Sequence, residues 1–342
     1  MSTNNNNNKK LFVVINSYSK QGISIINSLI QDGKWNIRGV SSRDSSTIAL
    51  ANEWKEKAAK NNVNIEFVQR DVTKDVSGLF DGADAAFLMT PNIDYADPDL
   101  PAKEIAFVTL QADEALKAKV QHVIFSSVDT LPHPEAIEPG FDILTCRPKV
   151  QAYIEKLAFP YVSVFLLAYF HSNTVEFIPP KQEVNATTGV TEFVFPFPYS
   201  IDSVQPYIDT YTATGPTVLA FLENPKLYNR NPIPLVSEWL TYRQVVETFE
   251  NITGIKSRPV QLSRKEYLEW NGFNGNPVTE LIGNRIFQVW ESTITQRYYD
   301  PSHDPTTFIT KIQPDALTWS TFLKTTQWKG ESYQEFKEKN HY

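Results

Sequence analysis

Three residues spaced three apart, Asn16, Ser19 and Gly22, stand between an apolar run and a helical pattern. The run LFVVIN, residues 11–16, is typical of a strand buried on both faces, and isoleucines then recur at helical spacing. A turn between a strand and a helix can hold a phosphate, because the first backbone N–H groups of a helix have no intrahelical partners. Dinucleotide-binding turns of this kind usually carry three glycines, of which only Gly22 is present.

Each glycine of such a turn has its own role: the tight turn, the close approach of a diphosphate, and the packing of helix on strand. Gly22 keeps the third role. Asn16 takes the first position, and asparagine tolerates left-handed backbone angles better than most residues. Ser19 takes the second, where its Cβ crowds a diphosphate although its hydroxyl can donate to a phosphate oxygen. Tyr18 is a bulky neighbour, and Lys20 adds a positive charge near the helix start. The spacing alone leaves a ligand-free strand–turn–helix open.

The elements that position this turn follow from the alternation of apolar β-branched runs and helical stretches. Strands are predicted over 35–42, 65–71, 85–90, 122–127 and 161–167, with helices over 45–62, 101–118 and 148–158. This order predicts an α/β, Rossmann-like, doubly wound parallel sheet. In such sheets ligands bind outside the carboxyl ends of the strands, which is where the turn lies.

The sequence changes character after about residue 177, where proline and aromatic residues become frequent. Helical patterns return at 241–253, 264–272 and 278–300. We therefore expect a disordered Asn-rich tail over residues 1–9, a Rossmann domain over 10–176 and a smaller α+β lobe over 177–342. The lobe is expected to be interleaved with the Rossmann domain and packed over the carboxyl ends of its strands.

The composition is that of an ordinary globular protein, with 342 residues, 41% hydrophobic and 21% charged, and a formal net charge of -7. This charge argues against direct nucleic-acid binding and against an anionic membrane surface. The apolar runs are shorter than the ~20 residues of a membrane span. A single cysteine, Cys146, excludes an internal disulfide, and whether its thiol is redox-active stays open. We expect a cytoplasmic protein, with a nuclear location also open.

Several segments resemble the NmrA-like family, atypical members of the short-chain dehydrogenase superfamily. They are KQG (20–22), DGKWNIRGVSSRD (32–44), VQRDV (68–72), HVIFSSVD (122–129) and FPYVSVFLLAYFHSN (159–173). Their order and spacing match the family over roughly residues 10 to 328. The resemblance implies a Rossmann domain that binds NADP(H). It also implies a regulatory role, because several members are redox sensors or partners of transcription regulators without demonstrated turnover.

The resemblance also implies which positions contact the cofactor. The phosphate turn falls on Asn16, Ser17, Tyr18, Ser19, Lys20, Gln21 and Gly22, the 2′-phosphate on Arg43, the adenine side on Asp71, the loop after the fourth strand on Thr90, Pro91 and Asn92, and the nicotinamide side on Arg147, Tyr169, Phe170, His171 and Ser172. An arginine after the second strand favours NADP over NAD, since an acidic residue there would hold a free 2′-hydroxyl. Asp44 beside Arg43 weakens this argument. Asp71 is equally readable as a turn residue.

The sequence departs from the superfamily where a proton must move. Its enzymes pair a tyrosine with a lysine four residues later, but Tyr153 lacks such a lysine, and Tyr333 with Lys337 lies in a polar C-terminal segment. Isoflavone reductase-like relatives use a lone lysine, whose position holds Arg147 here. Arginine stays protonated and cannot relay a proton near neutrality. The five histidines have no zinc-ligand spacing, so we expect no metal.

Three hypotheses follow. The first is a redox-sensing or regulatory NADP(H) binder, with a protein partner such as a transcription regulator. The second is an atypical NADPH-dependent reductase of a small substrate, in which water or Tyr169 would supply the proton. The third is a Rossmann scaffold that no longer binds nucleotide and acts as an interaction module. Enzymatic activity stays uncertain, and the sequence does not identify a substrate or an oligomeric state.

Overall fold

The computed structural model describes residues 9–90, 94–138, 141, 143–303, 312 and 318–340. Residues 1–8 of the Asn-rich tail lie outside the described residues, as do Pro91 and Asn92 of the predicted site.

A seven-stranded parallel sheet forms the centre of the molecule and confirms the predicted Rossmann-like architecture. Its strand order is β11-β6-β5-β4-β1-β2-β3. The strands are β1 (Lys10–Ile15), β2 (Trp35–Ser41), β3 (Ile65–Gln69), β4 (Ala85–Leu88), β5 (His122–Ser127), β6 (Tyr161–Leu167) and β11 (Ile233–Leu235). Strand β1 pairs with β2 on one side and β4 on the other, so Val13 lies opposite both Arg38 and Ala86. The strand order reverses between β1 and β4, which is where such sheets bind ligands.

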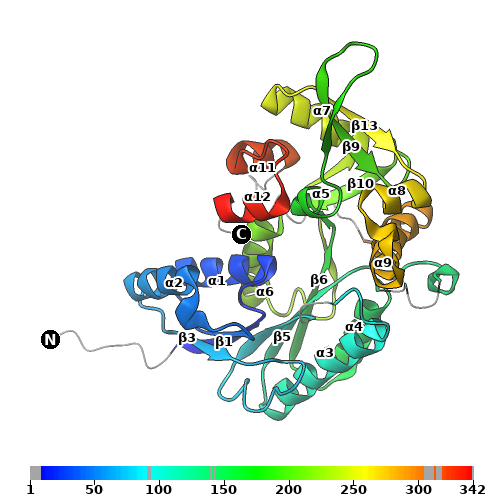
Figure 1. The fold of residues 1–342 in the computed structure, drawn as a ribbon. Helices are drawn as coiled ribbons and strands as arrows, with labels where there is room; N and C mark the ends of the chain where they lie inside the picture. Colours follow the sequence, from blue (N-terminus) through cyan, green and yellow to red (C-terminus); the bar gives the residue numbers. More distant parts are fainter. Residues whose placement is uncertain are drawn as a thin grey trace.

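Helices cover both faces of this sheet (Figure 1). They are α1 (Lys20–Asp32), α2 (Ala49–Lys60) and α6 (Thr210–Glu223) on one face, and α3 (Leu100–Lys117) and α4 (Cys146–Lys156) on the other. Helix α6 comes from the second half of the chain yet packs directly on α1. A Cβ at Gly215 would lie 2.2 Å from the backbone oxygen of Ser24, so only glycine permits this approach. Together with β11, α6 joins the second half of the chain to the central sheet.

The remaining elements form a smaller lobe around two three-stranded sheets, ordered β12-β10-β7 and β13-β9-β8. The strands are β7 (Tyr169–Phe170), β8 (Lys181–Val184), β9 (Thr191–Phe197), β10 (Val204–Ile208), β12 (Glu238–Thr241) and β13 (Ser257–Gln261). The helices are α5 (His171–Glu176), α7 (Tyr242–Thr253), α8 (Arg264–Trp270), α9 (Pro277–Thr295), α11 (Trp319–Thr326) and α12 (Tyr333–Asn340). Buried aromatic side chains form the core of this lobe, among them Phe195, Phe249, Trp290, Trp319 and Trp328.

Two predicted helices have different bounds in the structure. The helix predicted over 45–62 begins at Ala49, after a short 3-10 helix (Ser45–Thr47) that the Asp44 side chain caps by accepting from the Ser46 N–H. The helix predicted over 278–300 ends at Thr295. None of the described helices combines the length and apolar character that crossing a bilayer requires.

Candidate nucleotide-binding site

A cavity of about 340 Å³ opens at the carboxyl ends of the central strands, between the sheet and the smaller lobe. It brings together eight of the residues predicted to contact a cofactor. They are Asn16, Ser19, Lys20, Gln21, Thr90, Arg147, Tyr169 and Phe170. Ser17, Tyr18, Gly22, Arg43, Asp71, His171 and Ser172 do not line the cavity itself.

The first position of the turn shows how a side chain replaces a glycine. Asn16 has a φ of 54°, a left-handed backbone that asparagine tolerates better than most residues. Its amide Nδ2 donates to the backbone oxygen of Thr90 at 2.8 Å, and its backbone oxygen accepts from the Ser19 N–H at 2.9 Å. The side chain therefore fastens the turn after β1 to the end of β4.

Ser19 and Gly22 close the turn against helix α1. The Ser19 hydroxyl accepts from the Gly22 N–H at 3.0 Å, which caps the helix, and it contacts the Met89 sulfur at 3.4 Å. A Cβ at Gly22 would lie 2.4 Å from the Asn16 backbone oxygen, so glycine is required there. The cap occupies the Gly22 N–H, while the N–H groups of Lys20 and Gln21 belong to the first turn and have no intrahelical acceptor. These two groups give the helix start its capacity to bind an anion.

Tyr18 does not enter the cavity. Its ring stacks on Trp54 at 5.4 Å between centroids and packs on Phe67, beneath helix α2. The Arg43 guanidinium lies 5.4 Å from the Tyr18 ring centroid, just beyond the end of β2. The Asp44 carboxylate accepts from the Ser46 N–H at 2.9 Å. The Asp44 carboxylate therefore stabilises the short helix that follows it. Among the described residues, Arg43 has no carboxylate within ion-pair distance.

Asp71 follows β3 in a turn and is occupied by its neighbours. Its Oδ1 accepts from the Thr73 N–H at 3.1 Å and from the Thr73 hydroxyl at 2.7 Å, and Lys74 pairs with the other oxygen at 3.0 Å. The Thr73 hydrogen bond and the Lys74 charge lower the pKa of Asp71. These contacts are those of an ordinary turn residue.

Lys20 connects the start of α1 with α5. Its Nζ lies 2.8 Å from the Ser172 hydroxyl and 2.8 Å from Glu176 Oε2. Burial lowers the pKa of Lys20, and the Glu176 charge partly offsets this effect. His171 lies on a different side of α5, where its ring stacks on Tyr207 and its Nε2 lies 3.4 Å from Glu238 Oε1. Ser172 therefore contacts a cavity residue, Lys20, without lining the cavity, whereas His171 belongs to the core of the smaller lobe.

Arg147 lines the other end of the cavity from the first turn of α4. Its Nε donates to Glu104 Oε1 at 3.1 Å, and Glu104 is buried on α3. Burial by itself would lower the pKa of Arg147, but the Glu104 carboxylate more than compensates and the pKa is raised. Arg147 is therefore a permanent cation that can hold an anion or polarise a carbonyl but cannot exchange a proton.

An aromatic wall encloses this end of the cavity. The Tyr169 ring stacks on Trp290 at 4.1 Å between centroids and meets Tyr298 edge to face at 4.9 Å. The Tyr169 hydroxyl bonds to the hydroxyl of Thr293, and burial raises its pKa well above the ordinary value. Tyr169 is consequently a weak proton donor whose hydroxyl is already bonded to helix α9.

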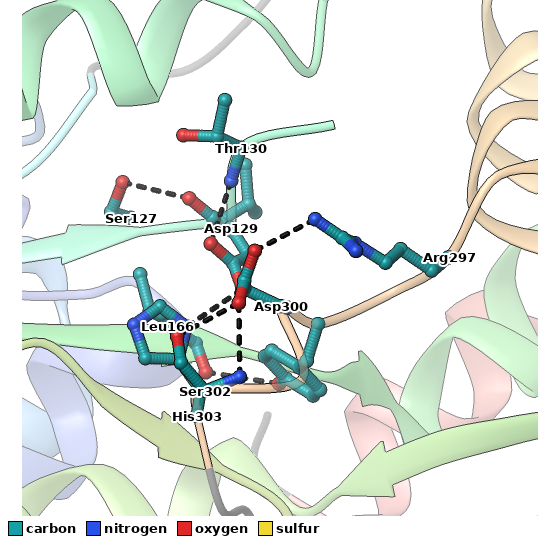
Figure 2. A network of polar contacts seen from close by, with 10 residues as sticks. Ser127, Asp129, Thr130, Leu166, Arg297, Asp300, Ser302 and His303 are labelled. Carbon is teal, nitrogen blue, oxygen red and sulfur yellow. Dashed lines mark hydrogen bonds and ion pairs between the residues drawn. The ribbon is translucent and has the colours of Figure 1, made fainter. Parts of the chain in front are cut away.

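Figure 2 shows the polar contacts of Asp129, Asp300 and His303 in the segment that follows α9. The Asp129 carboxylate, just past β5, accepts from the Asp300 N–H at 2.6 Å and lies 2.8 Å from His303 Nδ1. The Tyr299 hydroxyl donates to the backbone oxygen of Leu166 at 3.0 Å. These bonds hold the segment after α9 across the ends of β5 and β6, which explains why α9 stops short of its predicted end. Neither Asp129 nor His303 lines the cavity.

Sequence reasoning did not single out three residues that shape the cavity: Glu104, Glu176 and Tyr298. Glu176 follows Ser172 by four positions, so helical spacing would have placed both on one face of α5. Glu104 and Tyr298 carry no such signal, because their partners come from elements distant in sequence. Among the described residues, no group of three or more His, Cys, Asp or Glu side chains could hold a metal ion.

Comparison with known proteins gives a consistent family. The sequence model of the NmrA-like family matches residues 8–322. The NmrA-like family domain-containing oxidoreductase FrzB of Cladobotryum sp is 24% identical over 308 residues, covering 85% of this chain and 86% of the relative. Crystal structures of NmrA, a negative transcriptional regulator, in complex with NAD and with NADP have TM-scores of 0.72 and 0.71, at 20% identity over 98% of both chains.

The triphenylmethane reductase of Citrobacter sp., complexed with NADP(H), has a TM-score of 0.62 at 13% identity, over 92% of this chain and 99% of the reductase. The structural neighbours share the fold, and the family match spans nearly the whole chain. This chain therefore belongs to the NmrA-like family.

Proposed function

We propose that this protein binds NADP(H) in the cavity between its two lobes and acts as a regulatory, redox-sensing binder. The observation that carries the proposal is the turn between β1 and α1. Asn16 takes the left-handed backbone, Gly22 allows helix α1 to pack closely on the turn, and the first-turn N–H groups of Lys20 and Gln21 are available to a diphosphate. Tyr18, the bulkiest residue of the turn, stacks on Trp54 outside the cavity. The residues present thus fit a dinucleotide.

The preference for NADP over NAD rests on Arg43. It lies beyond the end of β2, held over the Tyr18 ring, and Asp44 is engaged with Ser46. An arginine at this position suits a 2′-phosphate, because its planar fork can donate two parallel hydrogen bonds. NmrA has been crystallised with either dinucleotide, so the family fold accommodates both.

A binding role is favoured over turnover because of the residues at the nicotinamide end. A bound dinucleotide would supply a ring able to carry hydride. Arg147 can hold or orient a carbonyl there, but its guanidinium is paired with Glu104 and cannot deliver a proton. The Tyr169 hydroxyl is buried against Thr293. We propose that the bound form of the nucleotide instead alters contacts with a protein partner such as a transcription regulator, in the cytoplasm or the nucleus.

Fluorescence titration tests this proposal, because seven tryptophans give the protein a strong signal. NADP, NADPH, NAD and NADH are each added to the purified protein. We expect saturable binding with NADP or NADPH tighter than the unphosphorylated pair. No response to any of the four would leave the nucleotide-free interaction module as the function of the fold.

A second candidate, an NADPH-dependent reductase of a small substrate, is favoured by the aromatic wall of the cavity and by the names of FrzB and the triphenylmethane reductase. Its test is NADPH oxidation with quinones and aromatic carbonyls, using the wild type and Arg147→Lys. Turnover that appears only in the lysine variant would support proton transfer as the missing step. Turnover by the wild type would establish the reductase.

A further inference from the structure

Lys20, the cation at the start of helix α1, is already paired with an anion of the protein, Glu176. Lys20 and Glu176 both line the cavity, and their Nζ and Oε2 atoms lie 2.8 Å apart. The pair is largely buried, with exposed side-chain fractions of 17% for Lys20 and 27% for Glu176. Partial burial strengthens the interaction relative to a surface ion pair, because water screens it less.

Other groups reinforce this arrangement. The Asp209 carboxylate, just before α6, raises the pKa of Lys20 as Glu176 does. The Lys337 ammonium lowers it. The Tyr333 ring of α12 lies 5.2 Å from Lys20 Nζ, and burial together with the Glu176 carboxylate raises the pKa of Tyr333. The local charge at the helix start is therefore balanced or negative before any ligand arrives.

Resting on the proposed function, we propose that Glu176 competes with the dinucleotide diphosphate for Lys20 and thereby sets the affinity of the site. A diphosphate bound over the first turn of α1 would lie close to Lys20, whose side chain is paired with Glu176. Two anions cannot share one buried ammonium without repulsion, so binding requires Lys20 to exchange Glu176 for the phosphate. The Tyr333 ring of α12 lies beside Lys20, so the exchange alters the surroundings of this helix.

A double-mutant cycle tests the competition. The variants are Glu176→Gln, Lys20→Gln and the combination of the two, titrated with NADP by calorimetry. Glu176→Gln preserves size and hydrogen bonding but removes the competing charge. We expect NADP to bind roughly tenfold tighter to this variant than to the wild type, and Lys20→Gln to bind roughly tenfold weaker. The gain from Glu176→Gln is expected to vanish in the Lys20→Gln background.

Glu223→Gln is the matched control, because Glu223 pairs with Lys34 at 3.3 Å on the exposed surface of α6 and does not line the cavity. Its NADP affinity is expected to equal that of the wild type. A second readout is hydrogen exchange in α12, which should change on NADP binding in the wild type and less in Tyr333→Phe.

The outcomes separate the two proposals. If the wild type binds NADP and Glu176→Gln binds it equally or more weakly, the competition is refuted while the proposed function stands. If the gain persists without Lys20, Glu176 repels the ligand directly and the exchange is refuted. If neither the wild type nor Glu176→Gln binds any pyridine nucleotide, the proposed function itself fails.

Discussion

The side chains that stand in place of glycines in the turn are bonded within the protein. Asn16 joins the end of β4 through its amide, and Ser19 caps α1 through its hydroxyl. The left-handed backbone of Asn16 is compatible with the residue type, because asparagine tolerates this conformation better than most residues. The cap could not be distinguished from a phosphate contact by sequence, because both use the same hydroxyl at the same helix start.

Gly22→Ala should destabilise the protein, because the added Cβ would lie 2.4 Å from the Asn16 oxygen and 2.8 Å from the Ser17 oxygen. Neither contact is with a flexible side-chain end, so the turn itself must move. We expect a loss of roughly 1–3 kcal/mol in the free energy of unfolding, measured by urea denaturation, together with weaker NADP binding. Gly275→Ala is the control, since its nearest contact is at 3.9 Å. Equal stability of both variants would show that the turn can accommodate a Cβ at position 22.

Arg43→Ala should remove the preference for the phosphorylated cofactor. Arg43 is the arginine next to the end of β2, where it lies over the Tyr18 ring, and the Asp44 carboxylate is bonded to the Ser46 N–H. Losing a charge-assisted contact should weaken NADP binding by roughly tenfold or more and leave NAD binding nearly unchanged. Arg243→Ala, which breaks an exposed pair with Asp202, provides the comparison. An unaltered ratio of NADP to NAD affinity would contradict the assignment of Arg43.

At the scale of elements, helix α9 holds residues 95–98, which lie between β4 and α3. Arg285 of α9 is fully buried, and its guanidinium donates to the backbone oxygens of Tyr95 at 2.8 Å, Asp97 at 2.6 Å and Pro98 at 3.2 Å. Tyr95 lines the cavity. A residue of the smaller lobe therefore positions part of the site on the central sheet.

Arg285→Lys should loosen this loop, because a lysine ammonium cannot reproduce the planar fork that reaches three carbonyls. We expect a loss of roughly 2–3 kcal/mol in unfolding free energy and weaker NADP binding. Arg264→Lys, on the partly exposed surface of α8, should cost less. Thermal denaturation and hydrogen exchange over residues 94–99 measure the effect. Unchanged thermal stability and unchanged exchange protection would mean that Arg285 does not stabilise this loop.

Strand β5 begins with a histidine that links stability to pH. Burial lowers the pKa of His122 to about 4, and its Nε2 lies 2.8 Å from the Ser163 hydroxyl. The unfolded chain, with an ordinary histidine pKa of about 6.5, binds more protons between pH 4 and 6.5. Stability from this group is thus complete above about pH 6.5 and is lost as the pH falls toward 4.

The expected contribution is up to roughly 3 kcal/mol, since each unit of pKa shift corresponds to about 1.4 kcal/mol. His122→Gln should therefore show a shallower fall in unfolding free energy from pH 6.5 to pH 4 than the wild type. Parallel profiles for His122→Gln and the wild type would mean that folding leaves the pKa of His122 unchanged.

The predictability of the elements follows their physical origin. The apolar runs of β1, β5 and β6 predicted a parallel sheet, because burial on both faces requires continuous apolar sequence. The strands β8, β9 and β10 were not predicted, since proline and aromatic residues obscure their alternation. The end of α9 was missed because it depends on Asp129, which is distant in sequence and captures the Asp300 N–H.

At the scale of the whole molecule, the cavity draws on both halves of the chain. The sequence predicted where the strands end and hence the location of the cavity. It did not predict the pairing of Arg147 with Glu104 or of Lys20 with Glu176, because the first contact needs α4 packed beside α3 and the second needs α5 packed beside the start of α1. Charge balance inside a cavity is a property of the assembled fold, and residue spacing carries little information about it.

The most direct measurement is a crystal structure of the protein grown with NADP. We expect the diphosphate to lie within hydrogen-bonding distance of the Lys20 and Gln21 backbone N–H groups, with the 2′-phosphate beside Arg43. Lys20 should then have left Glu176. A dinucleotide bound away from the start of α1, or a Ser19 or Tyr18 side chain occupying the place of the diphosphate, would contradict this expectation.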